Sequence, residues 1–360
     1  TNTRPYYRKK FEQIWTTDEH HINIMKEAWH QQEGSIETKL QHTMESLHSW
    51  GRKFFGIIPK RIKEVQQELH LMQQDQDNQS LNQQIKHKEQ EFDDLIEKED
   101  LWWSQSLGPY GLLMGIKTLN FSTKKLVNTT TNIAETVQVV QNKLTQDMYD
   151  VLHMAFTEEE VFNAIKDMKA LASPGPAGLP ARFYHTYWDI VGKDMTNIVL
   201  HVLNHDDNPQ PFNKTHICLI PKTNNPSLPS DYRPISLCNV TLKIITKTIA
   251  NRIKIILPNI ISPNQSAFVS GRLITDNTII ANEIFHYLNQ TTRQTGYVGI
   301  KTDMAKAYDR LEWGFLQATL EAMNFPPTMV KNVMKCVTTV SFSILINGKP
   351  TKAFSPEKGS

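Results

Sequence analysis

Lys301-Thr-Asp-Met-Ala-Lys-Ala-Tyr-Asp-Arg-Leu-Glu-Trp313 is the stretch of this sequence that decides the fold. The residues Gly296-Tyr-Val-Gly-Ile-Lys-Thr302 predict a short strand, and Leu311-Glu-Trp313 opens a helix. Asp303 therefore stands at the carboxyl end of a strand, where side chains point into the crevice above a sheet. Phosphoryl transfer through two Mg²⁺ ions needs such a carboxylate. These residues alone leave a second interpretation open, in which Asp303 caps the following turn.

The composition bounds the class of protein. The 360 residues are enough for two domains, with 39% hydrophobic and 21% charged residues to build a core and a surface. No run of about 18 apolar residues predicts a membrane span, and the N-terminus lacks the apolar run of a secretory signal. The widely spaced Cys218, Cys238 and Cys336 indicate a reducing compartment. We therefore expect an intracellular protein of the nucleus or cytoplasm with no membrane partner. The missing initiator Met suggests a piece of something longer.

Basic charge is concentrated in the second half of the chain. Residues 1–150 carry 18 Lys and Arg against 21 Asp and Glu, whereas residues 151–360 carry 21 against 16. Between 214 and 272, eight basic residues face one acid, Asp231. Such a segment suits a folded surface that meets phosphates, although a merely solvated basic face has the same composition.

The first 145 residues read as helical. Apolar residues recur at helical spacing over 11–32, and then at alternating steps of four and three from Ile58 to Met72. A polar gap at 73–80 interrupts this seam, which resumes from Leu81 to Trp102. The pattern predicts an antiparallel helical hairpin of coiled-coil character with its turn near 75–80. Loop residues follow at 104–132, and we place a domain boundary near 145.

The region from 146 onward alternates helices and strands, which gives an α+β fold. Thr157 followed by three Glu residues predicts a helix N-cap. Helices are expected at about 181–204 and from 240 to about 257, with a strand at 217–221. The run 340–349 predicts a strand that closes on an Asn-Gly turn.

Eight short motifs follow one another between 173 and 309. They are Ser173-Pro-Gly-Pro-Ala-Gly-Leu-Pro180, Ile217-Cys-Leu-Ile-Pro-Lys222, Asp231-Tyr-Arg-Pro-Ile-Ser-Leu-Cys-Asn239, Lys243-Ile-Ile-Thr-Lys247, Ala250-Asn-Arg252, Gln265-Ser-Ala-Phe-Val-Ser-Gly-Arg272, Asp276-Asn277 and Thr302-Asp-Met-Ala-Lys-Ala-Tyr-Asp309. In this order they resemble the reverse transcriptase of LINE-type (non-LTR) retrotransposons, particularly the kind abundant in plant genomes. Each motif alone is weak, and the ordered set is specific.

The resemblance implies the fold. Residues 146–360 would form a partial reverse transcriptase domain, comprising the fingers and the first part of the palm of a right-hand polymerase. Two stretches look like the helical region between endonuclease and polymerase in these elements: Phe11-Glu-Gln-Ile-Trp15 and Leu95-Ile-Glu-Lys-Glu-Asp-Leu-Trp-Trp103. Residues 1–145 would then be a linker-like helical region.

The resemblance also implies roles at the catalytic centre. Asp303 corresponds to the first Mg²⁺-binding carboxylate, and the carbonyl of Met304 would be its backbone neighbour at the metal. Tyr308 would lie under the incoming sugar, where an aromatic ring favours deoxynucleotides by colliding with a 2′-hydroxyl. A half-buried structural ring remains the alternative for Tyr308.

Basic residues take the remaining implied roles. Lys222 and Arg233 correspond to positions that meet the triphosphate of the deoxynucleotide. Lys243, Lys247 and Arg252 would contact the backbone of the RNA template or the DNA primer, although at least one of them is expected to be a plain helix residue. Arg272 would touch template or nucleotide.

The sequence also departs from the family pattern. Ala177 replaces the usual acid of the Pro-Gly-Pro-Asp-Gly loop, and Ser270 stands where Pro is common. The chain ends before the Ala-Asp-Asp hairpin, so two of three metal-binding aspartates are absent from these 360 residues. We therefore expect a fragment of an RNA-directed DNA polymerase that is inactive alone. The alternative is a non-enzymatic nucleic-acid-binding remnant or a helical interaction protein.

Overall fold

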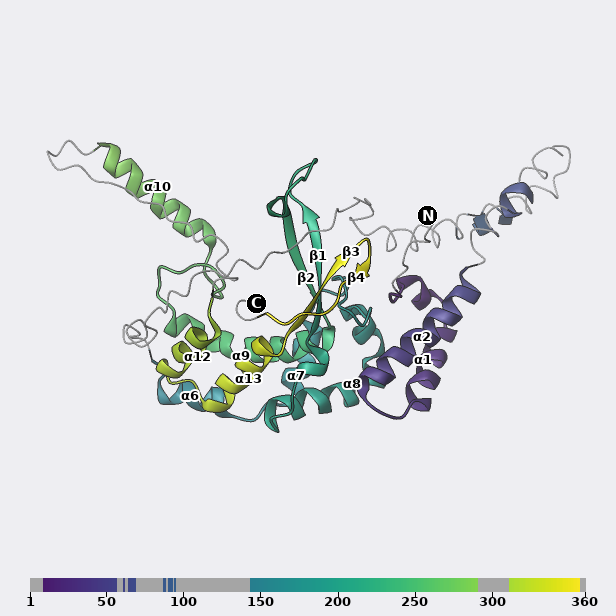
Figure 1. The fold of residues 1–360 in the computed structure, drawn as a ribbon, viewed down its shortest axis with the longest axis horizontal. Coiled ribbons are helices and arrows are strands. Elements are labelled where there is room, and N and C mark those ends of the chain that lie inside the picture. The colour runs from purple at the N-terminus through teal and green to yellow at the C-terminus, as the bar shows by residue number, and fades with distance from the viewer. Residues whose placement is uncertain are drawn as a thin grey trace.

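The computed structural model describes residues 9–56, 143–290 and 311–356, together with residues 61, 64–68, 87–88, 90–92 and 94. These residues form a mostly helical α+β structure with one small mixed sheet. Figure 1 shows the sheet beside a layer of helices, with the N-terminal helices at one end and α10 (Ile274–Gln290) projecting at the other. None of the helices described is long and apolar enough to cross a membrane.

The N-terminal segment contains the helices η1 (Gln13–Thr17), α1 (His20–Gln31) and α2 (Ile36–Phe54). The helix predicted over 11–32 is therefore broken at Asp18, which has extended backbone geometry. The hydroxyls of Thr16 and Thr17 donate to carbonyls of the preceding turn, and the Asp18 carboxylate accepts from the backbone N–H of His20 at 2.9 Å. Short polar side chains that bond to nearby backbone end a helix in this way.

The described residues between 61 and 94 are helical and belong to two segments that face each other. Arg61 pairs with Glu91 at 2.8 Å, and Lys88 pairs with Glu68 at 2.7 Å. Because the earlier residue of one segment pairs with the later residue of the other, the segments run antiparallel, as the predicted hairpin requires. The predicted turn near 75–80 lies outside the described residues.

Three helices follow residue 143: α6 (Gln146–His153), α7 (Glu158–Lys166) and α8 (Ala181–Asn204). The predicted N-cap of α7 is confirmed. The Thr157 hydroxyl accepts from the N–H of Glu160, and the Glu160 carboxylate accepts from the N–H of Thr157, which is a capping box. The prediction for α8 is confirmed as well, with a local kink at Tyr187.

The sheet has the order β2-β1-β3-β4. Strands β1 (Lys214–Pro221) and β2 (Tyr232–Cys238) form an antiparallel hairpin, and β3 (Ser341–Ile346) runs parallel to β1. The run predicted as one strand over 340–349 forms β3 and the start of β4 (Lys349–Pro350). The Asn-Gly turn between them is confirmed, since Asn347 and Gly348 both have positive φ, as a type I′ turn needs.

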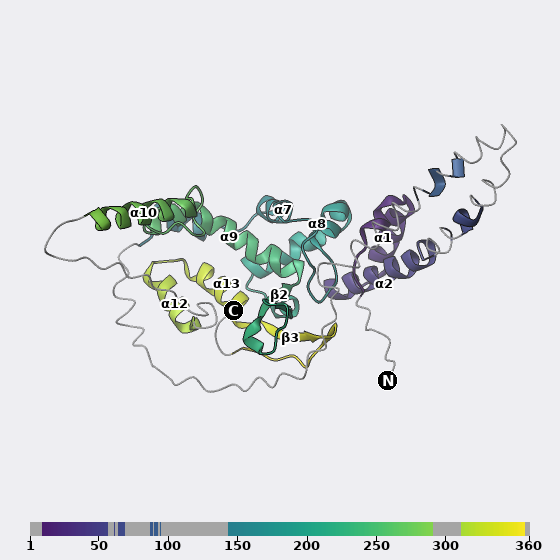
Figure 2. The same ribbon diagram turned by 90° about the horizontal axis from the view of Figure 1, so that it is seen from above.

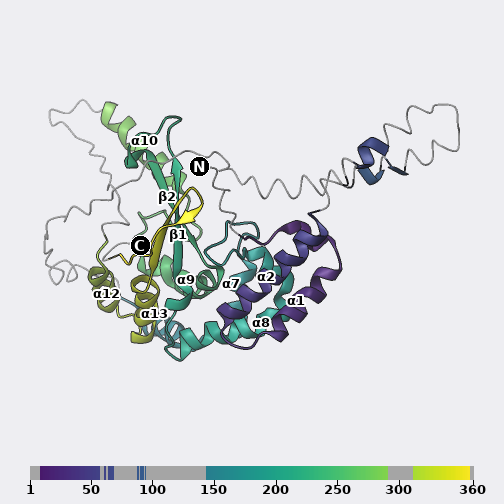
Figure 3. The same ribbon diagram turned by 45° about the vertical axis from the view of Figure 1, so that its right-hand side comes forward.

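The sheet is preceded by the short helix η2 (Gln210–Phe212), and η3 (Pro229–Asp231) lies in the β1–β2 connection. Helix α9 (Val240–Ile260) follows β2 and packs against α7 and α8 (Figure 2). Helices α12 (Trp313–Ala322) and α13 (Pro327–Thr338) lead to β3. Figure 3 shows α9 and α13 at the base of the sheet, and the β1–β2 hairpin extends away from these helices.

One hydrophobic core joins the N-terminal helices to α8. The ring of Phe11 packs edge-on against Phe183 and Tyr187, with centroids 5.7 and 6.1 Å apart. The carboxylate of Asp194 accepts from the indole N–H of Trp29 at 3.2 Å and pairs with Lys39 at 2.9 Å. Residues 9–56 therefore share their core with the region after 145. The boundary placed near 145 coincides with the Thr145 N-cap of α6, and the division into two domains stays a prediction.

Candidate nucleic-acid and nucleotide interface

Lys222 and Arg233 lie at the free end of the β1–β2 hairpin, which rises above the helices in Figure 1. The strand register pairs Ile220 with Arg233 and Pro221 with Tyr232. The N–H of Lys222 then donates to the carbonyl of Asp231 at 2.7 Å, which closes the loop. Both side chains are exposed. Two residues eleven positions apart in sequence are thus brought to one end of the sheet.

The only acid of the basic segment is used to build this loop. The Asp231 carboxylate accepts from the backbone N–H groups of Leu228 and Ser227, each at 2.9 Å. These donors hold the pKa of Asp231 below its usual value. The amine of Lys222 donates to the carbonyl of Ser230 at 2.8 Å, and its charge also acts on the Asp231 carboxylate, so one acid faces the two basic residues Lys222 and Arg233. The hairpin tip therefore presents net positive charge.

Lys243 and Lys247 lie on α9 and are partly exposed. The amine of Lys243 reaches the carbonyl of Ser173 at 3.5 Å, at the start of the Pro-Gly-rich loop. Both side chains are therefore accessible from solvent, and the structure is compatible with the predicted contact to template or primer.

Arg252, on the same helix, is buried, and its predicted role is corrected. Its side chain is 5% exposed and makes two bonds to the Glu160 carboxylate, at 2.8 and 2.6 Å. The guanidinium also donates to the carbonyls of Met154 and Ala155, and it lies 3.6 Å from the centroid of the Phe156 ring. The guanidinium is engaged inside the protein, so Arg252 holds the α6–α7 connection on α9 instead of contacting nucleic acid.

The ion pair with Arg252 also affects the pKa of Glu160. Burial favours a higher pKa for this carboxyl, but the hydrogen bonds from Arg252 and Thr157 outweigh it and hold the pKa below its usual value. Glu160 is therefore ionised at neutral pH and completes both the ion pair and the capping box of α7.

Arg272 has a structural role that the sequence did not reveal. Its guanidinium donates to the carbonyl of Gln265 at 2.8 Å, and to those of Pro258 and Ile261 at 3.1 and 3.2 Å. A further bond goes to the carbonyl of Ser262. These carbonyls end α9 and begin the next loop, so Arg272 satisfies groups that the helix leaves free. The predicted contact with template or nucleotide stays a prediction, and it would compete with these bonds.

Asn239 is a positioning residue whose role was not predicted from the sequence motifs. Its side chain accepts from the N–H of Ala177 at 2.9 Å and donates to the carbonyl of Phe212 at 3.1 Å. Gly175 approaches the same junction so closely that an added Cβ would lie 2.3 Å from the Asn239 nitrogen. The Pro-Gly-rich loop is thereby fixed against the start of α9. Ala177, which replaces the usual acid of the family pattern, is exposed.

Asp303, Met304 and Tyr308 lie outside the described residues, so their predicted roles remain untested. Within the ranges that are described, no group of three or more His, Cys, Asp or Glu side chains is placed to hold a metal ion. The described part of the chain therefore supplies the basic side of the candidate site, without the metal ligand that the resemblance implies.

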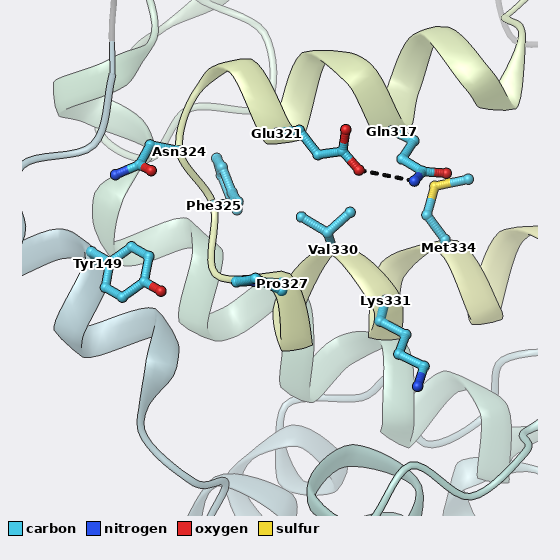
Figure 4. A pocket seen from close by; sticks show the side chains of 9 residues that line it. All are labelled: Tyr149, Gln317, Glu321, Asn324, Phe325, Pro327, Val330, Lys331 and Met334. Carbon is cyan, nitrogen blue, oxygen red and sulfur yellow. Dashed lines mark hydrogen bonds between the residues drawn. The ribbon is translucent and has the colours of Figure 1, made fainter.

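A cavity of about 590 Å³ lies between α6, α12 and α13 (Figure 4). Its charged residues have partners within the protein: Gln317 donates to Glu321 at 2.9 Å, and Lys331 pairs with Asp206. None of the residues predicted to bind nucleotide or nucleic acid lines it. The cavity is therefore separate from the candidate interface.

Part of this chain is similar to a known protein family. Residues 220–359 match the family described as reverse transcriptase (RNA-dependent DNA polymerase). This stretch holds the β1–β2 tip, α9 and the strands β2, β3 and β4.

Three similar proteins come from transposable elements. The transposon TX1 uncharacterized 149 kDa protein of Xenopus laevis is 28% identical over 208 residues, which cover 58% of this chain and 16% of that protein. The Pol polyprotein from the type-2 retrotransposable element R2DM of Drosophila melanogaster is 24% identical, covering 58% and 20%. The Pol polyprotein from the type-1 element R2 of Nasonia vitripennis is 23% identical, covering 47% and 16%. The chain thus spans a fifth or less of the length of these relatives.

Proposed function

We propose that this chain forms the fingers and the first part of the palm of an RNA-directed DNA polymerase from a plant-type non-LTR retrotransposon. The observation that carries the proposal is the β1–β2 hairpin. It places Lys222 and Arg233 together at a positively charged tip, inside the stretch that matches the family. A triphosphate needs such a pair, because Arg binds phosphate oxygens in bidentate geometry and Lys adds a point charge.

The proposed substrates are an RNA template, a DNA primer and deoxynucleoside triphosphates. Lys222 and Arg233 would bind the triphosphate, Tyr308 would lie under the sugar, and Asp303 with the Met304 carbonyl would bind Mg²⁺. When bound, Mg²⁺ would neutralise charge on the transferred phosphate. The division into a linker-like region, 1–145, and a polymerase region, 146–360, belongs to the same proposal, as does an intracellular location in the nucleus or cytoplasm.

Photocrosslinking of an azido-deoxynucleoside triphosphate tests the role of the hairpin tip. Replacing Lys222 and Arg233 by Ala together is expected to lower labelling of the 360-residue polypeptide by about tenfold, because two charge-assisted contacts of the triphosphate are lost. The matched control replaces the exposed residues Lys26 and Lys193, which lie on α1 and α8, and should label like the unchanged chain. Equal labelling of both double variants would remove the support for a triphosphate site at the tip.

Primer extension tests the second part of the proposal. With a DNA primer on an RNA template and Mg²⁺, the polypeptide of residues 1–360 is expected to incorporate no deoxynucleotide. The reason is that Asp303 is one of three metal-binding aspartates implied by the family, and the other two are absent from these residues. Measurable incorporation would contradict the proposed inactivity. No incorporation together with no salt-dependent binding of an RNA–DNA duplex would favour a helical interaction protein instead.

A further inference from the structure

Three lysines form one row along α9. Lys243, Lys247 and Lys254 are four and seven residues apart. At ~100° per residue they lie within about 40° of one another around the helix axis, and at ~1.5 Å per residue the row is about 16 Å long. Lys254 is exposed, and Lys243 and Lys247 are partly exposed. The row is thus a linear array of positive charge on the outer side of the helix.

The opposite side of α9 fixes the direction in which this row faces. The buried residues of the helix include Ile245, Ile249 and Ile256, which are at most 5% exposed and belong to the hydrophobic core with α7 and α8. Arg252 lies on that inner side and is anchored by Glu160. A helix held by this core cannot turn about its axis, so the three lysines remain directed to solvent.

The charges of the row are uncompensated by the described protein. No carboxylate among the described residues forms an ion pair with any of the three lysines, and no Asp or Glu occurs between Asp231 and Asp276. Some lysines elsewhere are paired, as Lys39 is with Asp194 and Lys335 with Asp206. Two like charges at i and i+4, as at 243 and 247, weaken a helix unless an anion lies against them.

The surface between the lysines is open. Ala250 is exposed and has only a methyl group, and Asn251 is partly exposed beside it with an amide that can donate to an anion. A long anion can therefore lie along the row without meeting a bulky side chain. A single small anion could contact Lys243 and Lys247 together, because they are four residues apart, but it could not also reach Lys254, since the row is about 16 Å long.

We propose that Lys243, Lys247 and Lys254 bind phosphates of one nucleic acid strand that runs along α9. The inference rests on the proposed function. It adds Lys254 to the residues proposed to bind nucleic acid and removes Arg252 from them. The length of the row corresponds to roughly five nucleotides at ~3.4 Å of axial rise each. Lysines bind phosphates as point charges, so the contact positions the strand and carries no base sequence. The strand belongs either to the RNA template or to the DNA primer, which share this backbone chemistry.

Binding measured as a function of salt tests the proposal. The 360-residue polypeptide is titrated against a fluorescently labelled single-stranded RNA, the matching single-stranded DNA and the RNA–DNA hybrid, each over a KCl series. Every Lys→Gln change in the row is expected to reduce the slope of log K against log[salt] by about 0.7 for a single strand or about 0.9 for a duplex. The triple change K243Q, K247Q and K254Q should reduce the single-strand slope by about 2.

The matched control is the triple change K26Q, K166Q and K193Q, which removes the same charge from exposed lysines on α1, α7 and α8 and should leave the slope unchanged. Superimposed circular dichroism melts of the two triple variants show that the fold is intact, and the single variants serve if the triple variant unfolds.

A slope loss with RNA alone identifies the template, and one with DNA alone identifies the primer. Salt-dependent binding with an unchanged slope in the α9 variant overturns this inference alone. If the unchanged chain binds none of the three ligands, the proposed function fails as well.

Discussion

Replacing Arg252 by Met is expected to lower the free energy of unfolding by about 3 kcal/mol. Removing one partner of a buried ion pair costs about 3–5 kcal/mol, and the lower end applies because the Glu160 side chain is one-third exposed and keeps some hydration. The carbonyls of Met154 and Ala155 lose their donor at the same time. Met fills a similar volume without charge, so the loss reports the ion pair and its hydrogen bonds. Chemical denaturation of the two proteins measures the difference.

The matched control for Arg252 is Lys254→Met on the same helix. Lys254 is exposed, so this change should alter the free energy of unfolding by about 0.5 kcal/mol or less. Adding Glu160→Gln to the Arg252 variant should recover part of the loss, since the stranded carboxylate is removed. A loss below about 1 kcal/mol for Arg252→Met would show that the guanidinium is not held inside the protein, and its assignment as a nucleic acid contact would return.

Replacing Trp29 by Ala is expected to lower the free energy of unfolding by about 3–5 kcal/mol, as for other large core side chains. Trp29 is 2% exposed, and its indole N–H donates to Asp194 on α8. The change therefore leaves a cavity and also weakens the attachment of α1 to α8. Hydrogen exchange should consequently become faster in α8, more than 150 residues away in sequence.

Ile22→Ala provides the control on the same helix, because Ile22 is 42% exposed. It should cost less than about 1 kcal/mol and leave exchange in α8 unchanged. If Trp29→Ala destabilised α1 and left α8 as protected as before, the N-terminal helices would fold independently. The shared core that joins them to α8 would then be contradicted.

Features determined by nearby residues were predictable from the sequence. The capping box at Thr157 and the Asn347-Gly348 turn follow from local backbone chemistry, and both are confirmed. The strand at 217–221 and the helix from Val240 follow from apolar periodicity, and the structure extends each by only a few residues. The break at Asp18 was not predicted, because the apolar spacing of the two flanking helices is nearly continuous. The polar side chains that end the first helix give only a weak sequence signal.

Long-range contacts were not predictable from the sequence. Arg252 reads as one more basic residue of α9, yet it continues the spacing of Ile245, Ile249 and Ile256, which was the available sign of burial. Its partner Glu160 is 92 residues away, and nothing local links the two. The packing of Phe11 on Phe183 and Tyr187 depends in the same way on how distant segments meet.

The most direct test of the interface is ultraviolet crosslinking of an RNA–DNA primer–template to the 360-residue polypeptide, with the crosslinked peptides mapped by mass spectrometry. We expect crosslinks at the β1–β2 tip, around Lys222 and Arg233, and along the lysine row from Lys243 to Lys254. We expect none at Trp29 or elsewhere on α1 and α2, which face α8. Crosslinks confined to α1 and α2, or absent from both the hairpin tip and α9, would contradict the proposed interface.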